Sequence, residues 1–128
     1  MDPIFHAGRA IGRAQVLSQI RENGARHLTA AASDLERSGL PGLKSVAGDL
    51  RRIASDWSRR KHDIVQITPR IQAEGGKTYQ AVSAGVLLGL ALESCGKASS
   101  DTRTAEAVAN VVTWLGGAKA HTAALRDQ

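Results

Sequence analysis

The sequence predicts an all-α fold, a single domain of five or six helices formed by 128 residues. Apolar residues make up 42% of the chain and aromatic residues only 3%, so the core must consist mainly of Ala, Leu, Val and Ile, which pack helices at close range. No alternation of apolar and polar residues is long enough for a strand, whereas spacings of three and four residues recur. A chain of this length suits one domain.

A first helix is expected over residues 3–23. Asp2 is expected to cap it. Pro3 would occupy the first helical position, where its missing N–H costs nothing because the helix has no acceptor for it there. Gly24 is expected just beyond its last residue. Gly8 and Gly12 would each destabilise an isolated helix by about 1 kcal/mol relative to alanine. Their spacing therefore indicates that another backbone approaches closely.

Residues 25–38 predict a second helix, whose inner face is formed by Leu28, Ala31, Ala32 and Leu35. After a turn rich in glycine and proline, residues 43–67 carry an apolar repeat of seven residues. It is formed by Leu43, Val46, Ala47, Leu50, Ile53, Ala54, Trp57, Ile64 and Ile67. The repeat predicts one continuous amphipathic helix, roughly 37 Å long at 1.5 Å per residue. Thr68-Pro69 should end or kink it, because proline disfavours the helical conformation of the residue before it.

The polar side of this predicted long helix is densely charged. An aspartate recurs in each heptad, at Asp49, Asp56 and Asp63. Arg60 and Lys61 interrupt the apolar stripe after Trp57, so the helix is expected to leave the core there and to be available for a partner. The expected partner-binding residues are therefore Arg51, Arg52, Trp57, Arg59, Arg60 and Lys61.

A central apolar helix is expected over residues 78–94. Gly75-Gly76 breaks the chain before it, and residues 68–77 are the candidate hinge. The segment is apolar nearly all round, with a stripe of small residues at Ala81, Gly85 and Gly89. A helix without a polar face is normally surrounded by others, which predicts a position at the centre of the bundle.

Two more helices are expected near the C-terminus, over residues 101–115 and 118–126. Ser99, Ser100 and Asp101 are candidate caps for the first of them. Its apolar face would consist of Ala105, Val108, Val112 and Leu115. Gly116-Gly117 would separate the two.

The net charge of +5 lies entirely in the first part of the chain. Residues 1–70 hold twelve basic and seven acidic side chains, whereas residues 71–128 hold five of each. The domain is therefore expected to have a basic half and a neutral, more apolar half. A one-sided positive field favours an acidic partner, whether protein, nucleic acid or anionic lipid.

The sequence also predicts a cytoplasmic protein. Cys95 is the only cysteine, which excludes an internal disulfide and indicates a reducing compartment. The first residues include an acid and two arginines, unlike a signal peptide. The most apolar run, residues 81–92, is shorter than the ~20 residues that span a bilayer. Arginine outnumbers lysine twelve to five, which is typical of a GC-rich bacterial or phage genome.

One short motif resembles the end of a phosphate-binding P-loop. Gly75-Gly76-Lys77-Thr78 has the final residues of that motif, whose glycine-rich loop must join a strand to a helix. Here Ile71 replaces the first glycine, Pro69 and Glu74 lie inside the loop, and no set of strands is expected. The preferred interpretation is a helix that begins after a Gly-Gly turn.

No catalytic, metal or cofactor site is expected. The histidines are scattered along the chain, at His6, His27, His62 and His121, and none is paired at metal-binding spacing. Cys95 is interpreted as a small buried apolar residue. No acid pair, nucleophile with a nearby base, or redox motif is present in the sequence, which argues against an enzyme.

The leading functional hypothesis is a small interaction module that docks its basic helix on an acidic protein surface. An adaptor or inhibitor encoded by a phage or another mobile element fits this size and composition. The alternative is nucleic-acid binding, in which the same arginines would contact phosphates. Residues 28–53 contain the parts of a helix-turn-helix, but the turn is one residue too long and Arg51-Arg52 comes too late. A homodimer that shares the apolar stripe is a further alternative.

Overall fold

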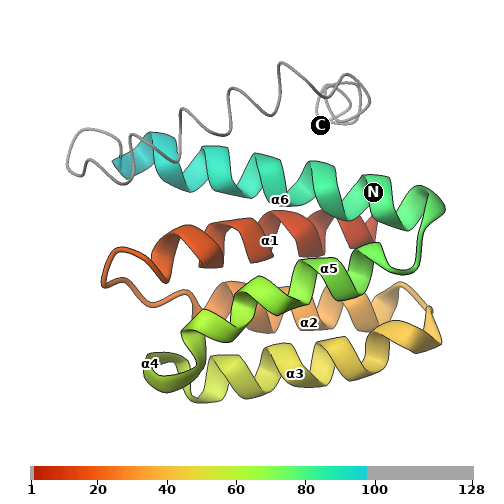
Figure 1. Ribbon diagram of the computed structural model, residues 1–128, viewed down its shortest axis with the longest axis horizontal. Helices are drawn as coiled ribbons and strands as arrows, with labels where there is room; N and C mark the ends of the chain where they lie inside the picture. Colours follow the sequence, from red (N-terminus) through yellow and green to blue (C-terminus); the bar gives the residue numbers. More distant parts are fainter. Residues whose placement is uncertain (1, 98–128) are drawn as a thin grey trace.

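The computed structural model describes residues 2–97, and the side chains of residues 95–97 lie outside the description. Within that range the chain is helical and has no strand, which confirms the all-α class (Figure 1). The helices expected over residues 101–126 lie outside the described residues. The elements are α1 (Pro3–Leu17), α2 (Ala25–Arg37), the 3₁₀ helix η1 (Pro41–Leu43), α3 (Lys44–Ser55), α4 (Trp57–Arg60), the 3₁₀ helix η2 (Lys61–Gln66), α5 (Ile67–Gln72) and α6 (Gly76–Lys97).

Helix α1 begins as predicted and ends earlier. The Asp2 carboxylate accepts a hydrogen bond from the backbone N–H of Ile4 at 2.8 Å. The helix stops at Leu17, and the left-handed φ of 56° at Arg21 prevents its continuation to residue 23. Gly24 is not the residue after α1 but the N-cap of α2. A side chain at Gly24 would collide with the Trp57 ring, 2.7 Å from its Cη2 atom.

The second helix, α2, closely follows its prediction. It covers residues 25–37, and all the apolar residues expected on its inner face are buried, namely Leu28, Ala31, Ala32 and Leu35. Gly39 follows with a φ of 76°, a conformation that costs a glycine little. The chain then turns through η1 into α3.

The prediction of one long helix over residues 43–67 is wrong. Helix α3 ends at Ser55, and Asp56 has φ −137° and ψ 51°, outside the helical region. Through α4 and η2 the chain reverses, and α5 runs back in the opposite direction to α3 (Figure 1). The prediction that Thr68-Pro69 ends a helix also fails, because Pro69 lies in the first turn of α5, where N–H groups have no intrahelical acceptor.

The apolar repeat is nevertheless buried on both arms of this reversal. Leu43, Leu50, Trp57 and Ile64 are at most 8% exposed. The neighbouring α2 has 13 residues and is thus roughly 20 Å long, so a straight helix of 37 Å would extend beyond it. Folding back places the second half of the repeat on the same core as the first half.

Helices α1 and α6 lie side by side and run in the same direction (Figure 1). Gly8 approaches Gly85, and Gly12 approaches Gly89. A Cβ atom on Gly8 would lie 2.6 Å from the carbonyl oxygen of Val82, so only glycine fits there. The expectation that Gly8 and Gly12 meet another backbone is confirmed.

Helix α1 holds the middle position within the described residues, between α2 and α6 (Figure 1). The core lies between these helices and the α3–α5 arms, and its largest fully buried apolar side chains are Ile11, Leu28, Leu35, Leu43, Leu50, Ile64, Ile67, Ile71 and Val82. The central position expected for α6 depends on residues after 97 and stays a prediction.

The predicted break before α6 is present. Gly75 and Gly76 have φ values of 72° and 54°, and α6 begins there. The residues before it form 3₁₀ and α helices rather than the strand that a P-loop requires. Gln72 donates a hydrogen bond from Nε2 to the Ser83 hydroxyl at 3.0 Å, which ties α5 to α6. Hinge motion in residues 68–77 stays a prediction.

Gly89→Ala is expected to destabilise the fold. Its methyl group would lie 2.9 Å from the backbone nitrogen of Arg13, and overpacking of this kind costs about 1–3 kcal/mol. Gly48→Ala is the matched control, because a methyl group on this α3 residue meets only Arg52 Nη2 at 3.9 Å and should stabilise the helix by about 0.5–1 kcal/mol. Urea unfolding followed by circular dichroism measures both changes. Equal stability of the two variants would contradict the role of the glycine contact.

Candidate functional site

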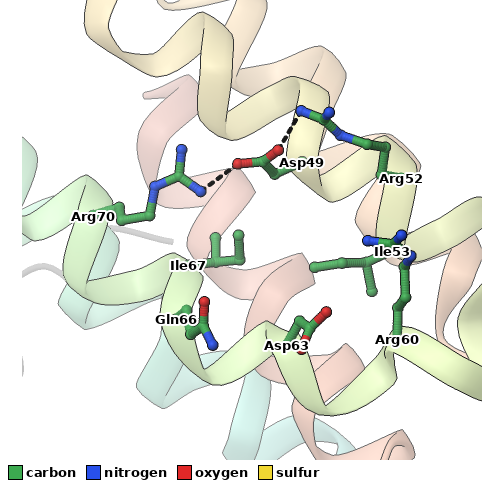
Figure 2. Close-up of a pocket in the computed structure, with 8 residues that line it drawn as sticks. All are labelled: Asp49, Arg52, Ile53, Arg60, Asp63, Gln66, Ile67 and Arg70. Atoms are coloured by element: carbon green, nitrogen blue, oxygen red, sulfur yellow. Dashed lines mark hydrogen bonds and ion pairs between the residues drawn. The ribbon is translucent and has the colours of Figure 1, made fainter.

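The reversal at Asp56 brings basic side chains from separate elements together around Asp49. This carboxylate on α3 pairs with Arg52 one turn later and with Arg70 on α5 (Figure 2). The second guanidinium nitrogen of Arg70 lies 3.5 Å from the Ser45 hydroxyl, also on α3. Asp49 and Arg70 are 21 residues apart in the sequence, so their contact holds the two arms together.

The electrostatic environment keeps Asp49 ionised. The hydrogen bond from Arg70 is the largest cause, and with the positive charges of Arg52 and Arg70 it lowers the pKa of the Asp49 carboxyl below its usual 3.8, against a smaller opposing effect of burial. The side chain remains one-third exposed. Solvent therefore screens the pairs, and each contributes modestly to stability.

A second cluster with the same composition lies at the reversal itself. Asp56 pairs with Arg59 Nε at 3.0 Å and more distantly with Arg60 Nε at 3.8 Å. Each aspartate is thus shared by two arginines, and each triad keeps a net charge of +1. We call Asp49, Arg52 and Arg70 the first triad and Asp56, Arg59 and Arg60 the second triad.

An open pocket of about 160 Å³ is lined by all three residues of the first triad and by Arg60 of the second (Figure 2). Ile53 and Ile67 line it with apolar atoms and are themselves 3% and 2% exposed. The other lining residues are Asp49, Arg52, Arg60, Asp63, Gln66 and Arg70. The pocket therefore combines an apolar lining with three guanidinium groups and two carboxylates.

The six residues predicted to bind a partner do not form one continuous face. Arg52 and Arg60 line the pocket, Arg59 lies outside it with a side chain 76% exposed, and Lys61 begins η2. Arg51 lies toward α2 and bonds to Glu36 Oε1 at 2.6 Å and to Ser33 Oγ at 3.3 Å. Trp57 is 8% exposed and packs beside Gly24, so its ring belongs to the core.

Arg70 and Gln66 also belong to this site, although no pattern in the sequence points to them. On a straight helix 21 residues would separate Asp49 and Arg70 by roughly 30 Å, so no local pattern could have paired them. The basic character of Arg70 was visible in the sequence. Its position became clear only from the reversal of the chain.

A further polar cluster, distinct from the two triads, lies between α1, α2 and α6. Glu93 Oε1 is 3.7 Å from Arg13 Nε and 4.0 Å from His27 Nε2. Burial, followed by the charges of Arg26 and Arg13, lowers the pKa of His27, and Glu93 opposes this effect only in part. The fold thus favours the neutral form of His27. Among residues 2–97, no group of three or more His, Cys, Asp and Glu side chains could hold a metal ion.

No protein-family model, curated protein or solved structure matches this chain. No helix in the described part of the chain is long and apolar enough to cross a membrane. The function must therefore be argued from the triads and the pocket themselves.

Acid should weaken the contact between α3 and α5. Because folding lowers the pKa of Asp49, its contribution to stability is complete above the unfolded pKa near 3.8 and is lost as pH falls through the lower folded value. The expected loss is about 1 kcal/mol or less, since the pair is partly exposed. Unfolding free energies measured between pH 5 and pH 2 should show a steeper decline for the wild type than for Asp49→Asn. Parallel curves would contradict this assignment.

Proposed function

We propose that this protein is a small non-enzymatic interaction module that docks on an acidic surface of another protein. The docking surface would be formed by the two triads with Lys61, which we call the arginine surface. The observation that carries the proposal is that each of two aspartates pairs with two arginines, and that three of these four arginines line one pocket. An adaptor or inhibitor, of bacterial or phage origin, would suit such a surface.

The pairing of these arginines with aspartate favours the binding of a partner. An aspartate that already holds two guanidinium groups limits their motion, so less side-chain entropy is lost when a partner arrives. Arginine can then form charge-assisted and often bidentate hydrogen bonds to a carboxylate. It is also enriched among the residues that dominate protein–protein affinity.

The interleaved carboxylates favour a protein partner over a nucleic acid. Duplex DNA presents one negative charge for about every 1.7 Å of its axis. Asp49, Asp56 and Asp63 lie on the arginine surface or beside it and would repel part of such an array. The carboxylates on a protein surface can be placed so that none of them faces one of these three aspartates. Nucleic-acid binding through the same arginines remains the alternative function.

Charge reversal tests the proposal. The full-length variant with Arg52→Glu, Arg59→Glu and Arg60→Glu should retain its helical circular dichroism spectrum and lose its protein partner in an affinity pull-down from the native host. The control carries Arg21→Glu, Arg26→Glu and Lys77→Glu, which change the net charge equally at exposed positions elsewhere. Each lost carboxylate contact should cost about 1–3 kcal/mol. Capture of the same partner by both variants would refute the arginine surface.

A salt titration separates the alternative function from the proposed one. Phosphate contacts predict binding of duplex DNA at ~50 mM salt that collapses by ~200 mM. The pull-down is therefore repeated after nuclease treatment. Loss of every partner after nuclease, together with salt-sensitive DNA binding, would favour the nucleic-acid function.

We also propose that residues 98–128 complete the bundle and make α6 its central helix. Val82 faces the core, whereas Ala84 lies about 200° around the helix from it and is still fully buried. The apolar residues at helical spacing after residue 100 suit a partner for that second face. They are Ala105, Val108, Val112 and Leu115.

Charges placed on that predicted apolar face should destabilise the protein. The double variant Val108→Asp, Val112→Asp would bury unpaired carboxylates and lower the free energy of unfolding by about 2 kcal/mol or more. Asn110→Asp with Thr113→Asp is the control, since these positions fall on the opposite side of the predicted helix. Urea unfolding compares the two. Equal stability would show that the segment does not cover α6.

A further inference from the structure

We infer that the pocket between α3 and the η2–α5 arm receives one glutamate side chain of the partner. This inference rests on the proposed function and specifies the chemistry that the arginine surface recognises. The pocket is lined by Arg52 from α3, Arg60 from α4 and Arg70 from α5, which the sequence separates and the reversal gathers (Figure 2).

The apolar lining selects for a side chain with methylene groups. Ile53 and Ile67 are almost completely buried and contribute to the wall of the pocket. Its volume of about 160 Å³ is on the scale of one amino-acid side chain. Glutamate carries two methylene groups before its carboxylate, so it can cover the isoleucines and still place its charge at the arginines. Aspartate has one methylene fewer, and inorganic phosphate has none.

Arg60 is the arginine best placed to receive the carboxylate. Arg52 and Arg70 already donate hydrogen bonds to Asp49. The contact of Arg60 with Asp56 has an Nε–oxygen distance of 3.8 Å, which exceeds hydrogen-bond length. Its guanidinium group therefore retains its full donor capacity for a ligand, and a charge-assisted bond to a carboxylate is among the stronger polar contacts in proteins.

The charge of the lining suits one carboxylate and no more. Three arginines and two aspartates give the pocket a net charge of +1, which a single glutamate would neutralise. Asp49 and Asp63 would then repel a second anion. A dense polyanion is a poor match for this arrangement, whereas an isolated glutamate on a protein surface fits it.

Nuclear magnetic resonance can test the pocket with an end-capped Gly-Gly-Glu-Gly-Gly peptide as the probe and full-length labelled protein as the receptor. We expect saturable shifts of the Gln66 side-chain amide and of the Ile53 and Ile67 methyl groups, with weaker binding of the same peptide with aspartate in place of glutamate. Arg60→Gln should weaken binding at least about tenfold, as expected for the loss of a charged hydrogen bond. Arg26→Gln is the matched control, because Arg26 is exposed on α2 and lies outside both the arginine surface and the pocket. It should change affinity by less than about twofold, because only its screened long-range charge acts on the probe.

The outcomes separate this inference from the proposed function. Equal weakening by Arg26→Gln and Arg60→Gln would overturn the pocket and leave a diffuse attraction between this basic protein and acidic peptides. Absence of pocket shifts with the glutamate peptide would also overturn it, and so would equal shifts with inorganic phosphate or an oligothymidylate. The proposed function is judged separately, by the pull-down with the charge-reversed variant.

Discussion

The direct contact between the backbones of α1 and α6 is the constraint on which the rest of the structure depends. Four glycines bring the helices so close that Cβ atoms at these positions would overlap backbone atoms of the other helix. Gly8 faces Gly85 and Gly12 faces Gly89. The residue numbers therefore rise in the same direction along both helices, which must be parallel. Close approach increases dispersion contacts along the whole interface, which compensates for the poor helix propensity of glycine.

Parallel packing of α1 and α6 determines the path of the chain between them. Because α1 ends at the opposite end of the bundle from the start of α6, the intervening chain must cross the bundle an odd number of times. It does so three times, through α2, α3 and the α4–α5 arm (Figure 1). One uninterrupted helix over residues 43–67 would allow only two crossings and would leave α6 antiparallel to α1. The reversal at Asp56 thus supplies the third crossing that the parallel contact of α1 and α6 requires.

Local chemistry explains which parts of the fold could be predicted. The Asp2 cap, the buried face of α2 and the break at Gly75-Gly76 depend on neighbouring residues, and all three are present in the structure. The glycines of α1 were informative because they are costly without a partner backbone. No adjacent glycine or proline marks the end of α1 at Leu17 or the break at Asp56. Apolar residues at helical spacing continue past both positions, to Ile20 and to Ile67, so periodicity gives no sign of either break.

The candidate site follows from the same topology and explains why its members were only partly predictable. Arg52 and Arg60 were expected from their charge, whereas Arg70 joins them only because the third crossing runs beside α3. The Asp49–Arg70 pair consequently has two roles: it holds the arms together and it forms one side of the pocket. A change at either residue would alter fold and surface at once. Arg60 contacts its aspartate only at 3.8 Å and makes no bridge between arms, so its substitution reports on recognition with the least disturbance of the fold.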